Sequence, residues 1–81
     1  GKLMEYREMS ANDKTVFGIV RVFLDGQDVT NTAFWALVPS LPGIEGPGEV
    51  RGFVEPMVKR ADGTLAEWHK TGVVSWAWRL T

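Results

Sequence analysis

The chain carries few side chains that could do covalent chemistry. His69 is its one histidine, and there is no cysteine, which excludes a thiolate nucleophile or metal ligand. A hydrolytic triad needs a hydroxyl, a base and an acid held together, but Ser10, Ser40 and Ser75 are far apart along the chain. A histidine without evident partners is better explained as a solvent-facing strand residue. We therefore predict no catalytic residue and no enzymatic activity.

Two acidic pairs are close enough in sequence to share a cation. Asp25 and Asp28 border an Asp-Gly turn, and Glu45 and Glu49 border a run of glycines. Aspartate is favoured in turns for backbone reasons, and an oxygen-ligand calcium loop needs more ligands than either pair offers. The glycines of residues 39–48 also lack the lysine that a phosphate-binding loop requires. We therefore predict no metal site and no cofactor.

The tryptophans are the residues best suited to binding. Trp35, Trp68, Trp76 and Trp78 could each fill the core or form an exposed platform for a base, a sugar or a peptide. Trp76 and Trp78 share the apolar face of a predicted strand, so we expect both in the core. Trp68 lies in the polar stretch AEWHK, which favours a position at the edge of a hairpin.

Strands must position these side chains. Alternating apolar residues predict a central strand at residues 16–24, and an Asp-Gly pair predicts a tight reversal directly after it. A two-residue turn there would pair Leu24 with Gln27, whereas a four-residue loop would pair Leu24 with Val29 and bury more apolar surface, so we expect the loop. Residues 30–38 are predicted as the next strand, with a short helical turn as the alternative.

The C-terminal half is predicted to form three further strands. They are residues 49–60, 65–70 and 73–80, joined by turns at Asp62-Gly63 and Thr71-Gly72. In the first hairpin Met57 would lie opposite Trp68, and Glu55 opposite Lys70. Pro56 has no N–H to donate to a ladder, so we expect it at an edge or a bulge.

The organisation is that of a single, mainly β domain spanning residues 1–81. We predict five or six short antiparallel strands in sequential hairpins, closing as a small barrel or sandwich, with one short helical turn as an option. The proline- and glycine-rich residues 39–48 are predicted as a loop that crosses the barrel end or binds a partner. A start at Gly1 suggests a cleaved tag or a processed precursor. No apolar stretch approaches the roughly 20 residues that cross a bilayer, so we expect no membrane association.

A protein partner is the function that we expect for this domain. Trp68, Met57 and Pro56 would form a contact patch beside an exposed sheet edge, and edge strands pair readily with other chains. The partner would be another protein or a second copy of this chain, because self-association would hide the edge and enlarge a small core.

A single-stranded nucleic acid is the alternative partner. Trp68 or Trp35 would stack on bases beside Arg51 and Lys70. Nine basic and ten acidic residues nearly cancel, however, and glutamates interleave with the basic residues of the C-terminal half. The weak overall field offers little attraction to phosphates, so we favour the protein partner.

Several strings of the sequence resemble small uncharacterised proteins encoded by bacteriophages and prophages. They are VRVFLDGQDVTN at residues 20–31, GEVRGFVEP at residues 48–56, the ADG turn and the closing GVVSWAWRL. The resemblance covers roughly two thirds of the chain and assigns no catalytic or binding residues. It implies a viral structural or accessory protein that acts by contact, located in the host cytoplasm or the virion.

Overall fold

The computed structural model describes residues 4–11, 16–54 and 59–80. Six antiparallel strands form one sheet in the order β1-β4-β5-β6-β2-β3. The elements are β1 (Tyr6–Ser10), α1 (Val16–Ile19), β2 (Val20–Leu24), β3 (Gln27–Asp28), β4 (Ala33–Pro39), β5 (Gly46–Phe53) and β6 (Glu67–Trp78). The prediction of a mainly β fold with five or six antiparallel strands is confirmed.

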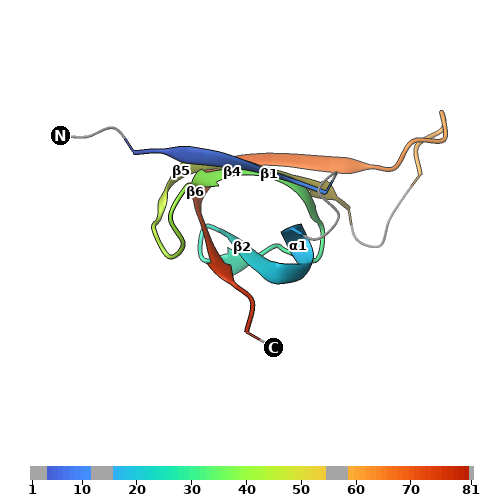
Figure 1. Ribbon diagram of the computed structural model, residues 1–81. Helices are drawn as coiled ribbons and strands as arrows, with labels where there is room; N and C mark the ends of the chain where they lie inside the picture. The colour runs from blue at the N-terminus through green and yellow to red at the C-terminus, as the bar shows by residue number, and fades with distance from the viewer. Residues whose placement is uncertain (1–3, 12–15, 55–58, 81) are drawn as a thin grey trace.

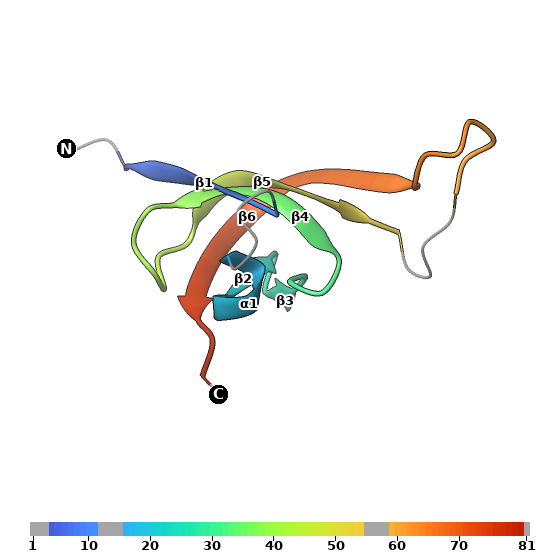
Figure 2. The same ribbon diagram turned by 45° about the vertical axis from the view of Figure 1, so that its right-hand side comes forward.

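The sheet folds over along β6. One part of β6 pairs with β5, from Glu67 to Val74, and the remainder pairs with β2, from Val74 to Trp78. Figure 1 shows β1, β4, β5 and the first part of β6 as one layer, with β2 and α1 beneath it. In Figure 2 the bend of β6 from the upper layer into the lower one is visible. β1 and β3 remain sheet edges, so the arrangement is a small open sandwich and not a closed barrel.

The core lies between the two layers. All but one of its side chains come from the strands β2, β4, β5 and β6, and the remaining one comes from β1. The buried apolar residues are Met9, Val20, Val22, Leu24, Ala36, Val38, Val50, Val74 and Trp76. Fully burying one large apolar side chain contributes about 1.5–3 kcal/mol, so this cluster is the main source of stability. The alternation that predicts the middle and last strands is therefore the pattern that builds the interior.

The strand predicted at residues 16–24 begins later than its sequence pattern suggests. Val16–Ile19 form a single helical turn, and the strand proper is Val20–Leu24. The turn after it has two residues and pairs Leu24 with Gln27, so the expected four-residue loop with Leu24 opposite Val29 is wrong. Asp25 and Gly26 take positive φ angles of 50° and 82°, as a two-residue turn of this type requires.

A buried threonine explains why the short turn is stable. β3 is only two residues long, and Thr30 takes over its pairing role. The Val22 N–H donates to Thr30 Oγ1 at 2.8 Å, and the Thr30 hydroxyl donates to Asp28 Oδ1 at 2.6 Å. A hydroxyl thus replaces a backbone carbonyl in the ladder. The alternation of apolar residues does not predict this role, because Thr30 is polar and acts through its hydroxyl.

The order of the strands differs from a simple series of hairpins. Residues 30–38 do contain the favoured strand, as β4, but β4 pairs with β1 and β5 and not with the strand before it. β2 similarly pairs with β6, the last strand of the chain. The register of β4 shifts between Ala33 and Trp35, which marks an irregularity around Phe34.

The C-terminal pairing differs most from its prediction. β6 continues through Thr71-Gly72, where a turn was expected. Trp68 lies opposite Gly52, and Lys70 opposite Val50, so the predicted pairings with Met57 and Glu55 are wrong. Pro56, Met57 and Glu55 themselves lie outside the described residues.

Glycines determine this register. A Cβ on Gly52 would overlap the indole of Trp68, and a Cβ on Gly48 would overlap the Leu37 carbonyl and the side chain of Val74. Glycine is therefore needed at both positions for β5 to pass between its neighbours. Because β5 begins at Gly46, the connection predicted at residues 39–48 shortens to residues 40–45.

Candidate functional site

The last two tryptophans lie in contrasting environments. Trp76 is 2% exposed and donates its indole N–H to the Pro39 carbonyl oxygen at 2.9 Å. Trp78 follows on the same face of β6 but is 56% exposed. The prediction that both fill the core is right for Trp76 and wrong for Trp78. Trp78 lies opposite Val20, the first residue of β2, so the sheet ends beside this indole and does not cover it.

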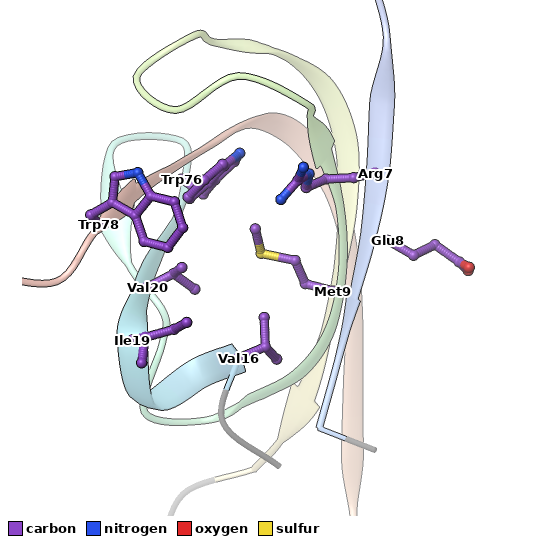
Figure 3. Close-up of a pocket in the computed structure, with 8 residues that line it drawn as sticks. All are labelled: Arg7, Glu8, Met9, Val16, Ile19, Val20, Trp76 and Trp78. Carbon is purple, nitrogen blue, oxygen red and sulfur yellow. The ribbon is translucent and has the colours of Figure 1, made fainter. Parts of the chain in front are cut away.

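Trp78 forms one wall of a hollow between β1, α1, β2 and β6, which we call the aromatic groove (Figure 3). The groove encloses about 340 Å³ and is lined by Arg7, Glu8, Met9, Val16, Ile19, Val20, Trp76 and Trp78. The two indoles meet edge to face, with ring centroids 4.9 Å apart and an interplanar angle of 81°. Ile19 is 50% exposed, so it presents apolar surface to solvent together with Trp78.

Arg7 brings a positive charge into this apolar setting. Its Cζ lies 5.3 Å from the ring centroid of Trp76, within the range of a cation–π contact. Figure 3 shows the guanidinium directed into the groove, whereas the Glu8 side chain leaves β1 on the opposite side. Within the described part of the chain, no acidic side chain pairs with Arg7. The groove thus joins an aromatic wall to a cation that is available for a ligand.

Arg79 holds α1 in place behind the groove. The Arg79 backbone N–H donates to the Ile19 carbonyl at 2.9 Å, and its guanidinium donates to the Phe17 carbonyl at 3.1 Å. A four-residue helix cannot satisfy these carbonyls internally, and a cation at its C-terminal end is favourable. Arg79 directly follows Trp78, so one contact sets the positions of both Ile19 and Trp78.

Sequence reasoning missed the groove residues Arg7, Ile19 and Trp78. Positions i and i+2 of a strand share a face, so the sequence contains no signal that separates exposed Trp78 from buried Trp76. Arg7 reaches the groove because β1 pairs with β4, a contact between segments far apart in sequence. No local pattern around Arg7 indicates that pairing.

Two of the predicted partner residues do come together, on the face of the sheet turned away from the core. Trp35 and Arg51 are cross-strand neighbours on β4 and β5, and Arg51 Cζ lies 4.8 Å from the Trp35 ring centroid. We call this pair the outer stack. Acidic groups surround it: the Trp35 indole N–H donates to Glu8 Oε1 at 3.2 Å, and Glu49 Oε2 lies 2.7 Å from His69 Nε2.

The other predicted partner residues lie elsewhere. Trp68 packs against the core on the inner face, and its indole N–H donates to the Phe53 carbonyl at 3.0 Å. Lys70 shares with it a small hollow of about 250 Å³. Trp68 is therefore partly buried and anchored, which differs from the open hairpin edge expected for it. Pro56 and Met57, its expected companions, lie outside the described residues.

An open sheet edge exists along the first part of β6. β2 meets β6 only from Val74 onward, and at the boundary the Val73 N–H donates to Asp25 Oδ1 at 3.0 Å. Within residues 4–11, 16–54 and 59–80, no strand pairs with this side of β6 before Val74. Exposed charged and polar side chains cover this stretch, namely Glu67, His69 and Lys70. Such side chains discourage strand addition, so the groove is the stronger candidate site.

The acidic turn residues serve the backbone. Asp28 accepts hydrogen bonds from the Thr30 N–H at 2.9 Å and from Arg21 at 3.0 Å. Partial burial raises the pKa of Asp28, but the hydrogen bonds from Thr30 and the Arg21 charge outweigh it, so the pKa lies below its ordinary value. Among the described residues, no three His, Cys, Asp or Glu side chains cluster so that they could hold a metal ion. The described helix is also too short to cross a membrane.

Comparison of the chain with protein-family models, curated proteins and solved structures finds no match. The resemblance to phage-encoded proteins therefore stays a prediction.

Proposed function

We propose that this protein is a non-enzymatic interaction module that binds an apolar side chain of a partner protein in the aromatic groove. The observation that supports this most is the exposure of Trp78, at 56%, beside Ile19, at 50%. Large aromatic and aliphatic side chains at such positions are the usual anchors of protein interfaces. Trp78 and Ile19 line the same hollow, and adjoining exposed apolar side chains are typical of interaction sites.

The groove is supported by fixed elements. Trp76 is held by its hydrogen bond to Pro39, and α1 is held by Arg79. A partner would therefore bind walls that are already ordered, which reduces the entropy lost on association. Arg7 is the one charged side chain that Figure 3 shows directed into the groove. A hollow with apolar walls and one polar group favours recognition over acid–base chemistry.

Peptide selection tests this proposal directly. A random peptide library is panned against the wild-type chain, and the enriched peptides are tested against Trp78→Ala and Trp35→Ala. Peptides with an aromatic or aliphatic anchor should bind the wild type and Trp35→Ala and lose affinity for Trp78→Ala by about tenfold or more. Peptides that bind both variants equally, or no enrichment at all, would contradict the proposal.

A nucleic acid partner at the outer stack is the second candidate. Phe34 and Phe53 add a second pair of rings there, with centroids 4.7 Å apart, next to Trp35 and Arg51. Bases could stack on these rings. Glu8 already occupies the Trp35 indole N–H and would repel phosphates. Binding of a labelled oligothymidylate at low salt, weakening steeply as salt rises, would favour this candidate, and no binding at low salt would remove it.

A further inference from the structure

We infer that the aromatic groove selects a carboxylate attached directly to the apolar group it binds, and that its ligand is the C-terminal residue of a partner chain. This inference rests on the proposed function, because it names the partner chemistry for the same groove. It goes further, because apolar walls alone would accept any apolar side chain. The added selectivity comes from Arg7.

Arg7 is prepared to bind an anion. Its guanidinium lies over Trp76, which is 2% exposed and cannot move away. The N–H edge of a guanidinium matches a planar bidentate acceptor. Within the described part of the chain, no acidic group uses that edge. Arg7 is itself exposed, so a ligand can reach it from solvent, and a carboxylate would gain a charge-assisted hydrogen bond from its guanidinium.

The size of the groove indicates where the carboxylate belongs on the ligand. At about 340 Å³ the hollow lies near the lower end of the range for ligand pockets, roughly 300–1,000 Å³. Arg7 and the two indoles line that one hollow, so the cation and the apolar walls face the same small volume. A C-terminal residue carries its side chain and its carboxylate on one carbon. An acidic side chain on a neighbouring residue would need additional backbone to fit inside.

The outer stack provides a control within the same chain. Arg51 stacks on Trp35 at a similar distance, 4.8 Å against 5.3 Å for Arg7 on Trp76. Glu8 hydrogen-bonds that tryptophan, and Glu49 lies on the same face of β5 as Arg51. A carboxylate ligand would meet two acidic side chains there. An arginine–tryptophan contact alone therefore does not predict a carboxylate site. What distinguishes the groove is that the Glu8 side chain, next to Arg7 in sequence, leaves β1 on the opposite side (Figure 3).

Matched small probes separate the carboxylate from the apolar group. Titrations by heteronuclear NMR compare N-acetyl-L-phenylalanine, its amide, and acetyl-aspartyl-phenylalaninamide, which carries its carboxylate on a neighbouring side chain. We expect the acid to bind wild-type protein about tenfold more tightly than the amide, the effect of one charge-assisted hydrogen bond. The aspartyl peptide should bind no better than the amide.

Three variants at the two exposed arginines test which of them produces the preference for the acid over the amide. Arg7→Gln should bind acid and amide alike, Arg7→Lys should keep a reduced preference for the acid, and Arg51→Gln should match the wild type. Equal binding of acid and amide to wild type would overturn this inference and leave the proposed function, because the amide still reports an apolar groove. Tight binding of the aspartyl peptide would overturn the assignment to a chain terminus. No binding of any probe would overturn both proposals.

Discussion

The protein stacks an arginine on a tryptophan twice, and the surroundings of the two stacks differ. In the aromatic groove, Arg7 lies over buried Trp76 with no acidic partner in the described part of the chain. In the outer stack, Arg51 lies over partly buried Trp35, whose indole N–H bonds Glu8. The same pair of residue types therefore forms a candidate ligand site in one place and lies beside acidic side chains in the other. The neighbours of such a pair determine whether it can bind a ligand.

The two stacks also depend on different parts of the fold. The outer stack lies within the upper layer, between β4 and β5. The aromatic groove combines β1 of the upper layer with α1 and β2 of the lower layer, and it includes the end of β6, which joins them. Changes to the lower layer should therefore disturb the groove and spare the outer stack.

Replacing the tryptophan of each stack should give the largest difference. Trp76→Ala should lower the free energy of unfolding by about 3–5 kcal/mol, because it leaves a cavity in the core and frees the Pro39 carbonyl. Trp35→Ala should cost about 1 kcal/mol or less, because Trp35 is only partly buried and its partner Arg51 is exposed. Urea unfolding measures both. Should Trp76→Ala fail to fold, Trp76→Phe, which keeps a ring, serves in its place. Equal losses of unfolding free energy at positions 76 and 35 would contradict the difference between the two stacks.

Releasing α1 should affect the groove alone. Arg79→Met removes the guanidinium bond to the Phe17 carbonyl, and a hydrogen bond from a charged group contributes about 1.5–3 kcal/mol. We expect a loss of stability of that order and weaker binding of N-acetyl-L-phenylalanine. The indole N–H resonance of Trp35 should stay in place. A shift of the Trp35 resonance as large as that of Trp78 would show that the two stacks are not independent.

Acid should weaken the lower layer through Asp28. Its pKa is lowered in the folded protein, so the unfolded chain binds more protons as pH falls below the ordinary value of 3.8. The stabilisation from Asp28 is complete above that pH and is lost as pH falls through the lower folded pKa. Asp28→Asn should therefore show a shallower loss of stability below about pH 4 than the wild type. An unchanged acid limb in urea unfolding would contradict this assignment.

Removing the acids of the outer stack should give the smallest effect. In the double variant Glu8→Gln and Glu49→Gln, Arg51 should gain a weak preference for the acid probe over the amide. We expect about a twofold difference, the effect of one exposed charge pair. The chemical shift of the Trp35 indole N–H measures it. A preference as strong as that of the aromatic groove would mean that the apolar walls of the groove add nothing to carboxylate binding by Arg7.

The sequence predicts the interior well and the surfaces poorly, for a physical reason. Alternation identifies Val20, Val22, Val74 and Trp76 as core positions because alternate side chains of a strand lie on one face of the sheet. Register depends on contacts between distant segments, such as Gly52 against Trp68, which no local pattern contains.

The candidate sites also depend on contacts between segments that are distant in sequence. Trp35 and Arg51 are among the predicted partner residues and do meet, but as cross-strand neighbours beside acidic side chains. The aromatic groove depends on where β2 begins, which leaves Trp78 uncovered, and on the pairing of β1 with β4, which brings in Arg7. Helix formation at residues 16–19 overrides their alternating pattern and supplies the third side of the groove.

The four indole N–H resonances provide the most direct test that the aromatic groove is the binding surface. In a titration of the wild-type protein with N-acetyl-L-phenylalanine, the Trp78 resonance should move most and the Trp76 resonance should follow. The resonances of Trp35 and Trp68 should stay within experimental error. Movement of Trp35 or Trp68 in place of Trp78 would contradict the account.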